Sequence, residues 1–163
     1  MKRFVPIDFQ VPDSLEGEGF RLRMLTINDV VKDYDAVMSS VDHVNKIWPG
    51  GTWPVGLTLE QNLIDLGWHQ KEFQTRRSFT YTVVSPDESR VLGCVYIEPT
   101  SKEGYDAEVC LWARSSELSS GFENRLLASV ESWLASHWPF KKVGFPGRRI
   151  SWQEWNAMPD DQR

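Results

Sequence analysis

Hydrophobic and polar positions along this chain fall into two repeating patterns. Alternating or β-branched runs predict strands at 21–25, 78–84, 91–98, 105–113 and 141–145. Apolar residues at three- and four-residue steps predict helices with one buried face within 30–41, 59–73 and 122–134. A shorter terminal helix is predicted after Ser151, which caps it together with Glu154. The order β-α-α-β-β-β-α-β-α indicates an α+β fold in which helices cover a central mixed sheet.

Polar residues mark where these helices begin. Thr26 precedes the first helix as an N-cap, with an acid in the first turn. The stretches Thr58–Gln61 and Ser120–Glu123 both have the form of a capping box, in which the first and last side chains satisfy backbone amides at the helix start. Between the first two helices, residues 48–54 contain two prolines and two glycines, so this stretch is predicted to be a loop.

The three central strands follow one another through short turns, which predicts an antiparallel meander. Because side chains alternate across a strand, one face of the second and third of these strands is expected to be core, and it carries Val91, Gly93, Val95, Ile97, Ala107, Val109 and Leu111. The more polar face is expected to border a cleft, and it carries Cys94, Tyr96, Glu98, Asp106, Glu108, Cys110 and Trp112.

Composition narrows the classes of function. The length of 163 residues predicts a single domain over 1–163, with an extended N-terminal segment at 1–18. The net charge of −5 lacks the basic footprint of a nucleic-acid-binding protein, and no apolar run approaches the roughly 20 residues that span a bilayer. We therefore expect neither a nucleic-acid nor a membrane partner, and a cytoplasmic location. Cys94 and Cys110 are expected to be reduced thiols, and the three histidines form no metal-binding motif.

Four ordered segments together resemble the GNAT acyltransferases. They are Gly19–Leu25, Val91–Ile97, Ala107–Ala113 and Gly121–Leu127, and the likeness extends over residues 19 to 158. The resemblance implies a mixed, mostly antiparallel sheet with helices on both faces. The chain ends without the last two strands that many members carry, so a homodimer partner or a short edge is expected there.

The resemblance also implies an activity. Members move an acetyl group from acetyl-CoA to a primary amine, here on an unidentified small molecule or protein, without a metal. The alternative is a catalytically silent module that keeps the fold and binds CoA or another ligand. This alternative rests on Leu118, on Glu123 and on the lack of a tyrosine in the terminal helix, where this chain has Trp152 and Trp155.

In these acyltransferases the strand before the long helix splays from its neighbour and pairs with the pantetheine arm. By resemblance, the backbone of Leu111, Trp112 and Ala113 would do so here. The helix-start amides of Ser119, Ser120, Gly121 and Phe122 would bind the pyrophosphate.

The family loop resembles Arg/Gln-x-x-Gly-x-Gly/Ala, and only Gly121 of the matching residues 118–123 fits it. Glu123 stands where a small residue normally lets phosphate approach. It either competes with the cofactor for the helix end or serves as the last residue of the capping box.

Glu108 is the preferred general base, because a carboxylate on an inner strand beside Cys110 and Trp112 should be partly desolvated. Its alternative role is a structural acid, bonded for example to Tyr96, which is the candidate proton donor. Glu98 and Asp106 lie closer to the turn, where solvated surface roles are expected. By resemblance, the acceptor amine is expected near Trp48, Trp53 and Trp68, for which buried packing is the competing role.

Overall fold

A six-stranded sheet runs through the computed structural model, which describes residues 3–162. The strands lie in chain order as β1 (Ser14–Gly17), β2 (Phe20–Met24), β3 (Phe79–Val84), β4 (Val91–Glu98), β5 (Ala107–Ala113) and β6 (Val143–Gly144). Strands β1 to β5 are antiparallel to their neighbours, and β6 is parallel to β5. The predicted mixed, mostly antiparallel sheet is therefore confirmed.

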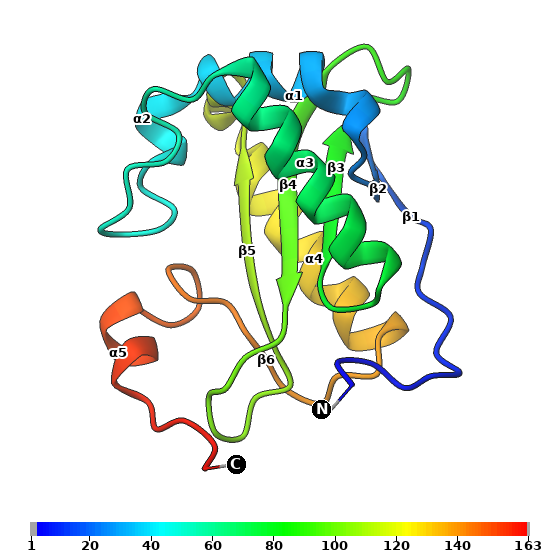
Figure 1. Ribbon diagram of the computed structural model, residues 1–163, viewed down its shortest axis with the longest axis vertical. Helices are drawn as coiled ribbons and strands as arrows, with labels where there is room; N and C mark the ends of the chain where they lie inside the picture. Colours follow the sequence, from blue (N-terminus) through cyan, green and yellow to red (C-terminus); the bar gives the residue numbers. More distant parts are fainter. Residues whose placement is uncertain (1–2, 163) are drawn as a thin grey trace.

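Helices cover both faces of this sheet (Figure 1). In chain order they are η1 (Ile27–Asp29), α1 (Val30–Met38), α2 (Val41–Val44), α3 (Leu59–Gln74), η2 (Ser115–Ser120), α4 (Phe122–His137) and α5 (Trp152–Ala157). Helices α1 and α3 lie over the near face in Figure 1, and α4 lies behind the sheet. The α+β class with helices on both faces agrees with the prediction.

The sheet separates two hydrophobic cores, because successive side chains of β4 and β5 point to opposite faces. Val95 and Leu111 pack with α4 in one core, whereas Cys94 and Trp112 pack with α1 in the other. The predicted division of the faces is right for these residues. It is wrong for Val91, which joins the α1 core because the β3–β4 register shifts between Val83 and Val84.

The helix starts were predicted with mixed success. Thr58 Oγ1 accepts a hydrogen bond from Gln61 N–H at 3.1 Å, and Ser151 caps α5 in the same way at 3.1 Å. The capping box predicted before α4 is wrong. The N-cap is Gly121, whose φ of 75° lies in the left-handed region, and no side chain caps this helix.

Other elements differ from the prediction in segments where the hydrophobic pattern is weak. The segment 1–18, expected to be merely extended, contains β1, which pairs with β2 through Gly17 and Phe20. The strand predicted at 141–145 shrinks to Val143–Gly144. Helix α2 begins at Val41, where the first predicted helix was expected to end, and its other residues were predicted to belong to no element.

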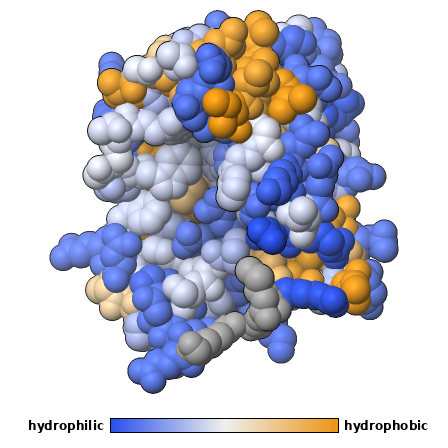
Figure 2. All heavy atoms as spheres, viewed as in Figure 1, coloured by the Kyte–Doolittle hydropathy of each residue, from blue (hydrophilic) through white to orange (hydrophobic). Residues whose placement is uncertain are grey.

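Exposed apolar side chains gather on the face shown in Figure 2, over α1 and α3 at the top of the view. The members on these helices are Val31, Leu59, Leu63, Ile64 and Trp68. Within the described residues, no helix is long and apolar enough to cross a membrane.

Candidate active site

Strands β5 and β6 separate almost as soon as they meet. They pair only at Ala107 with Val143 and at Glu108 with Gly144. On its other side, β5 stays paired with β4 from Glu108 up to Ala113. The predicted divergence therefore lies on the β6 side, where a hollow of about 230 Å³ is lined by Leu111 among others.

The first turn of α4 lies at the upper end of this opening. The amides of Phe122, Glu123 and Asn124 have no acceptor within residues 3–162, as expected for the first turn of a helix without a side-chain cap. Gly121 N–H, by contrast, donates to Leu118 O at 3.1 Å. The amides available to an anion thus begin at Phe122, the last of the four residues predicted for this role.

The Glu123 side chain points away from its own helix start and into the opening. Its Oε2 accepts hydrogen bonds from Ala113 N–H at 2.9 Å and lies 2.5 Å from His43 Nε2. Its Oε1 accepts from Arg148 at 2.6 Å. Burial opposes ionisation of this carboxyl, yet the bonds from Ala113, Arg148 and His43 hold its pKa below the ordinary value.

Arg148 closes the opening from the β6 side. While one guanidinium nitrogen binds Glu123, the other donates to Leu111 O at 2.9 Å. Leu111 O and Ala113 N–H belong to the three residues whose backbone was expected, by resemblance, to pair with pantetheine, and both have partners inside the chain. Arg148 also places a cation in this opening, and residues 118–123 contain no cation of their own.

Two carboxylates face each other at the lower end of the sheet. Glu98 and Glu108 are directly opposite across β4 and β5. Glu108 Oε2 accepts hydrogen bonds from Trp155 Nε1 at 3.0 Å and from Thr100 Oγ1 at 3.3 Å. Burial, and then the charge of Glu108, raise the pKa of the Glu98 carboxyl.

Tyr96 lies one step inward from Glu98 on the same face. Its hydroxyl accepts a hydrogen bond from Trp112 Nε1 at 3.1 Å, so the suggested bond to Glu108 is absent from the described contacts. Burial raises its pKa well above the ordinary value, which keeps the phenol protonated. The Tyr96 ring meets the ring of Trp48 at 5.1 Å and that of His69 at 5.5 Å.

The three tryptophans predicted for the acceptor do not lie together. Trp48 and Trp53 meet edge to face at 5.6 Å and pack against the α1 core. Trp68 lies on α3 with 57% of its surface exposed and lines a separate, larger cavity.

The two cysteines are free and buried. Burial raises the pKa of both thiols, that of Cys110 to about 12, so neither is a reactive thiolate near neutral pH.

Sequence reasoning missed His43, Arg148 and the raised pKa of Glu98. His43 and Arg148 come from elements far along the chain from Glu123, and no local pattern connects them. Glu98 and Glu108 face each other because of the register between β4 and β5, and the sequence did not predict this pairing.

No family model matches the sequence, and no curated protein matches it. Solved structures of acetyltransferases do match the fold. RimL, a ribosomal L7/L12 α-N-protein acetyltransferase, matches with a TM-score of 0.64 and 15% identity over 94% of this chain and 81% of its own. The ribosomal-protein-S5-alanine acetyltransferase of Vibrio fischeri matches at 0.59 and 19%, covering 74% of this chain and 66% of that one.

A third match is the microcin C7 self-immunity acetyltransferase MccE, which was solved with acetyl-CoA and AMP. Its TM-score is 0.59 at 10% identity, over 76% of this chain and 67% of its own. This chain therefore spans about two thirds to four fifths of the length of these proteins. At identities of 10–19% the likeness concerns the fold, and the chain has the fold of the GNAT acetyltransferases.

Proposed function

We propose that this chain, acting as a single domain over 1–163, is an acetyl-CoA-dependent N-acetyltransferase acting on a primary amine of a small molecule or a protein. The observation that carries the proposal is the divergence of β5 from β6 beside the free amides that begin α4. Structures of the same fold are acetyltransferases, and one was solved with acetyl-CoA. The cytoplasmic location and the homodimer stay predictions.

Several groups of the chain fit the pyrophosphate and pantetheine of acetyl-CoA. Amides at Phe122 to Asn124 and the guanidinium of Arg148 offer donors and positive charge for phosphate oxygens. Leu111 O and Ala113 N–H offer the backbone pair for an amide arm, after Arg148 and Glu123 have released them. Ser119, Ser120 and Trp112 flank these groups; the Ser120 hydroxyl donates to Glu117 O at 2.8 Å, and the Trp112 indole donates to Tyr96.

In the reaction the amine nitrogen forms a bond to the thioester carbonyl carbon, and the carbon–sulfur bond breaks to release the thiolate. Glu108 is the proposed base that takes the proton from the ammonium form of the acceptor, with its carboxylate positioned by Trp155 and Thr100. Tyr96, protonated and on the same face, is the proposed donor to the leaving thiolate, and it regains its proton from the nitrogen, which loses its second proton as the amide forms.

The second candidate is a silent module that binds CoA without turnover. It is supported by the contacts of Glu123 and Arg148, which occupy the two backbone groups that an acetyl-CoA arm needs. Turnover separates the two candidates, because both require binding and only the first requires chemistry.

A thiol-release assay with acetyl-CoA and a panel of small amines and free peptide termini tests the proposal. We expect release with at least one class of amine, and we expect Glu108→Gln to lower kcat by about 100-fold or more. Glu103→Gln, on the exposed turn between the same strands, is the matched control and should leave kcat unchanged. Binding of acetyl-CoA without release from any amine would favour the silent module; unchanged turnover in Glu108→Gln would remove Glu108 as the base.

A further inference from the structure

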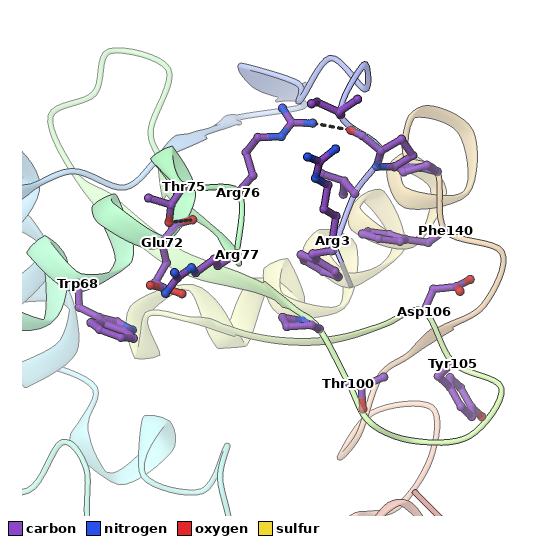
Figure 3. A pocket seen from close by; sticks show the side chains of 16 residues that line it. Arg3, Trp68, Glu72, Thr75, Arg76, Arg77, Thr100, Tyr105, Asp106 and Phe140 are labelled. Carbon is purple, nitrogen blue, oxygen red and sulfur yellow. Dashed lines mark hydrogen bonds between the residues drawn. The ribbon is translucent and has the colours of Figure 1, made fainter. Parts of the chain in front are cut away.

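A cavity of about 830 Å³ lies below the sheet, between the N-terminal segment, the end of α3 and the β4–β5 turn. Figure 3 shows Trp68, Glu72 and Arg77 along one wall, Arg3 and Phe140 along another, and Thr100 and Tyr105 at the lower side. This volume falls in the upper part of the range typical of ligand pockets and exceeds what a single amino acid fills.

Aromatic side chains give the cavity firm apolar walls. Phe140 stacks on Phe4 with ring centroids 5.1 Å apart, and Tyr105 meets Trp155 edge to face at 4.8 Å. Trp68 adds an indole that is more than half exposed and belongs to neither hydrophobic core. Such walls hold the side chains or the backbone of an extended ligand by contact area.

The charge of the cavity opposes that of the whole chain, whose net charge is −5. Three arginines line it against two acids. Asp106 is engaged, because its Oδ2 accepts from the amides of Lys141 at 2.7 Å and Lys142 at 3.0 Å. Within residues 3–162, the guanidinium groups of Arg3 and Arg77 have neither an ion pair nor a hydrogen bond. Two unpaired cations in one cavity favour an anionic ligand.

Glu72, in contrast to the two arginines, needs a hydrogen-bond donor. Only 8% of this residue is exposed, and its Oε1 is buried without a hydrogen-bond partner in the described part of the chain. A buried carboxylate oxygen without a donor is costly, so it indicates a donor that comes from outside the chain. A ligand with an N–H group as well as carboxylates meets both requirements.

The wall that carries Glu72 and Arg77 includes one residue with a strained backbone conformation. Arg76 follows α3 with a φ of 60°, in the left-handed region where glycine would be less strained. Its guanidinium donates to Pro6 O at 2.7 Å and to Phe9 O at 2.9 Å. Arg76 thereby ties the N-terminal segment to α3 and keeps Arg3 and Arg77 on facing walls of the cavity.

One hydrogen bond connects the lining of the cavity to the candidate base. Pro99 and Thr100 belong to its lining, and Thr100 donates to Glu108 Oε2 at 3.3 Å. A chain lying in the cavity with its amino end toward Thr100 would bring that amine to Glu98 and Glu108. This orientation of the ligand rests on the proposed function. The preference of Arg3 and Arg77 for an anionic ligand does not depend on it.

We propose that this cavity binds the amino-terminal segment of an acidic peptide. Arg3 and Arg77 bind its carboxylates, Glu72 accepts from its backbone N–H, and its free amino end lies toward Glu108. The acceptor class of the proposed transfer is therefore a peptide with acidic residues next to its free amino end.

Calorimetric titration without acetyl-CoA tests the binding directly. The probes are the peptide Ala-Asp-Glu-Ala-Glu-Ala and its neutral counterpart Ala-Asn-Gln-Ala-Gln-Ala. We expect saturable binding of the acidic probe at low salt, with affinity at least about tenfold above that of the neutral probe. Arg77→Gln and Arg3→Gln should each weaken the acidic probe by about tenfold, and Glu72→Gln should weaken both probes.

Arg21→Gln is the matched control, because it removes one positive charge from β2, outside the cavity lining, where Arg21 pairs with Glu16 of β1. Equal affinity for the two probes, or equal loss in Arg77→Gln and Arg21→Gln, would overturn the inference. Failure of the two proposals is distinguishable. If the acidic peptide binds but no acetyl group is transferred, the proposed enzymatic function fails and the proposed peptide site remains. If acetyl groups are transferred to amines but the acidic peptide does not bind, the peptide site fails and the enzymatic function remains.

Discussion

Asp33 is a buried carboxyl group on α1, outside the candidate site. Only 3% of the residue is exposed, and its Oδ2 accepts a hydrogen bond from Asn62 Nδ2 at 2.9 Å. Burial, opposed by the Asn62 bond, raises its pKa from 3.8 to about 6. An acid whose pKa is higher in the folded state stabilises the fold below its unfolded pKa, and this contribution is lost as pH rises through the folded pKa.

We therefore predict that Asp33→Asn stabilises the protein at pH 8 and changes little at pH 4. Asparagine keeps an oxygen for Asn62, and it removes a charge whose burial costs on the order of 2–3 kcal/mol from the size of the shift. Urea unfolding at the two pH values measures the difference. Asp42→Asn, on exposed α2, controls for net charge. A gain of the same size at both pH values would show that ionisation of Asp33 is not the cause.

Single residues also show where sequence reasoning ends. The fold pattern placed Glu108, Tyr96 and Trp112 on one face correctly, because alternation along a strand is a local property. It did not predict that Trp155 binds Glu108, since this contact joins positions 47 residues apart. Burial of an acid such as Asp33 likewise depends on what packs over it, which periodicity does not give.

At the scale of elements, the most consequential contact joins α4 to the segment after β6. Glu123 on α4 holds Arg148 at 2.6 Å and His43 at 2.5 Å, in the opening between β5 and β6. The sequence predicted that Glu123 either competes with the cofactor or caps its helix. The structure shows no such cap and places its carboxylate against Ala113 N–H.

Acetyl-CoA affinity is expected to respond in opposite directions to the two partners of this contact. Glu123→Ala removes a negative charge near the phosphates and frees Arg148, so we predict tighter binding by about tenfold. Arg148→Ala removes the cation, and we predict weaker binding by a similar factor. Calorimetry measures both variants.

Glu131→Ala is the matched control for Glu123→Ala, because Glu131 is also on α4 and pairs with Arg149 on the surface. It should leave acetyl-CoA affinity unchanged. Unchanged or poorer affinity in Glu123→Ala would remove the idea that this carboxylate competes with the cofactor.

Helices and strands were predictable to the extent that their signals are local. The buried stripe of α4, with Leu126 and Val130, and the β-branched run of β3 needed no tertiary information. Strand β1 has only four residues and no apolar run, so its pairing with β2 was not predictable. Strand β6 is short because the chain leaves β5 after two pairs, and that departure opens the candidate site.

The whole molecule has two openings near the candidate site, and Glu108 is hydrogen-bonded to Thr100 of the second one. One lies between β5 and the segment around Arg148, and the other is the large cavity near Thr100. In the proposed transfer, acetyl-CoA occupies the first opening and the acceptor amine comes from the second. The order of elements predicted the sheet, but the second opening depends on how the N-terminal segment folds back beneath α3 (Figure 1).

The proposed binding site of acetyl-CoA is the first of these openings. A crystal structure of the protein with CoA would show where the cofactor lies. We predict the phosphates at the amides of Phe122 to Asn124, and the pantetheine arm along β5 in place of the Arg148 bond to Leu111 O. A complex in which that bond and the bond from Ala113 N–H to Glu123 persist, with CoA bound elsewhere or not at all, would contradict the account.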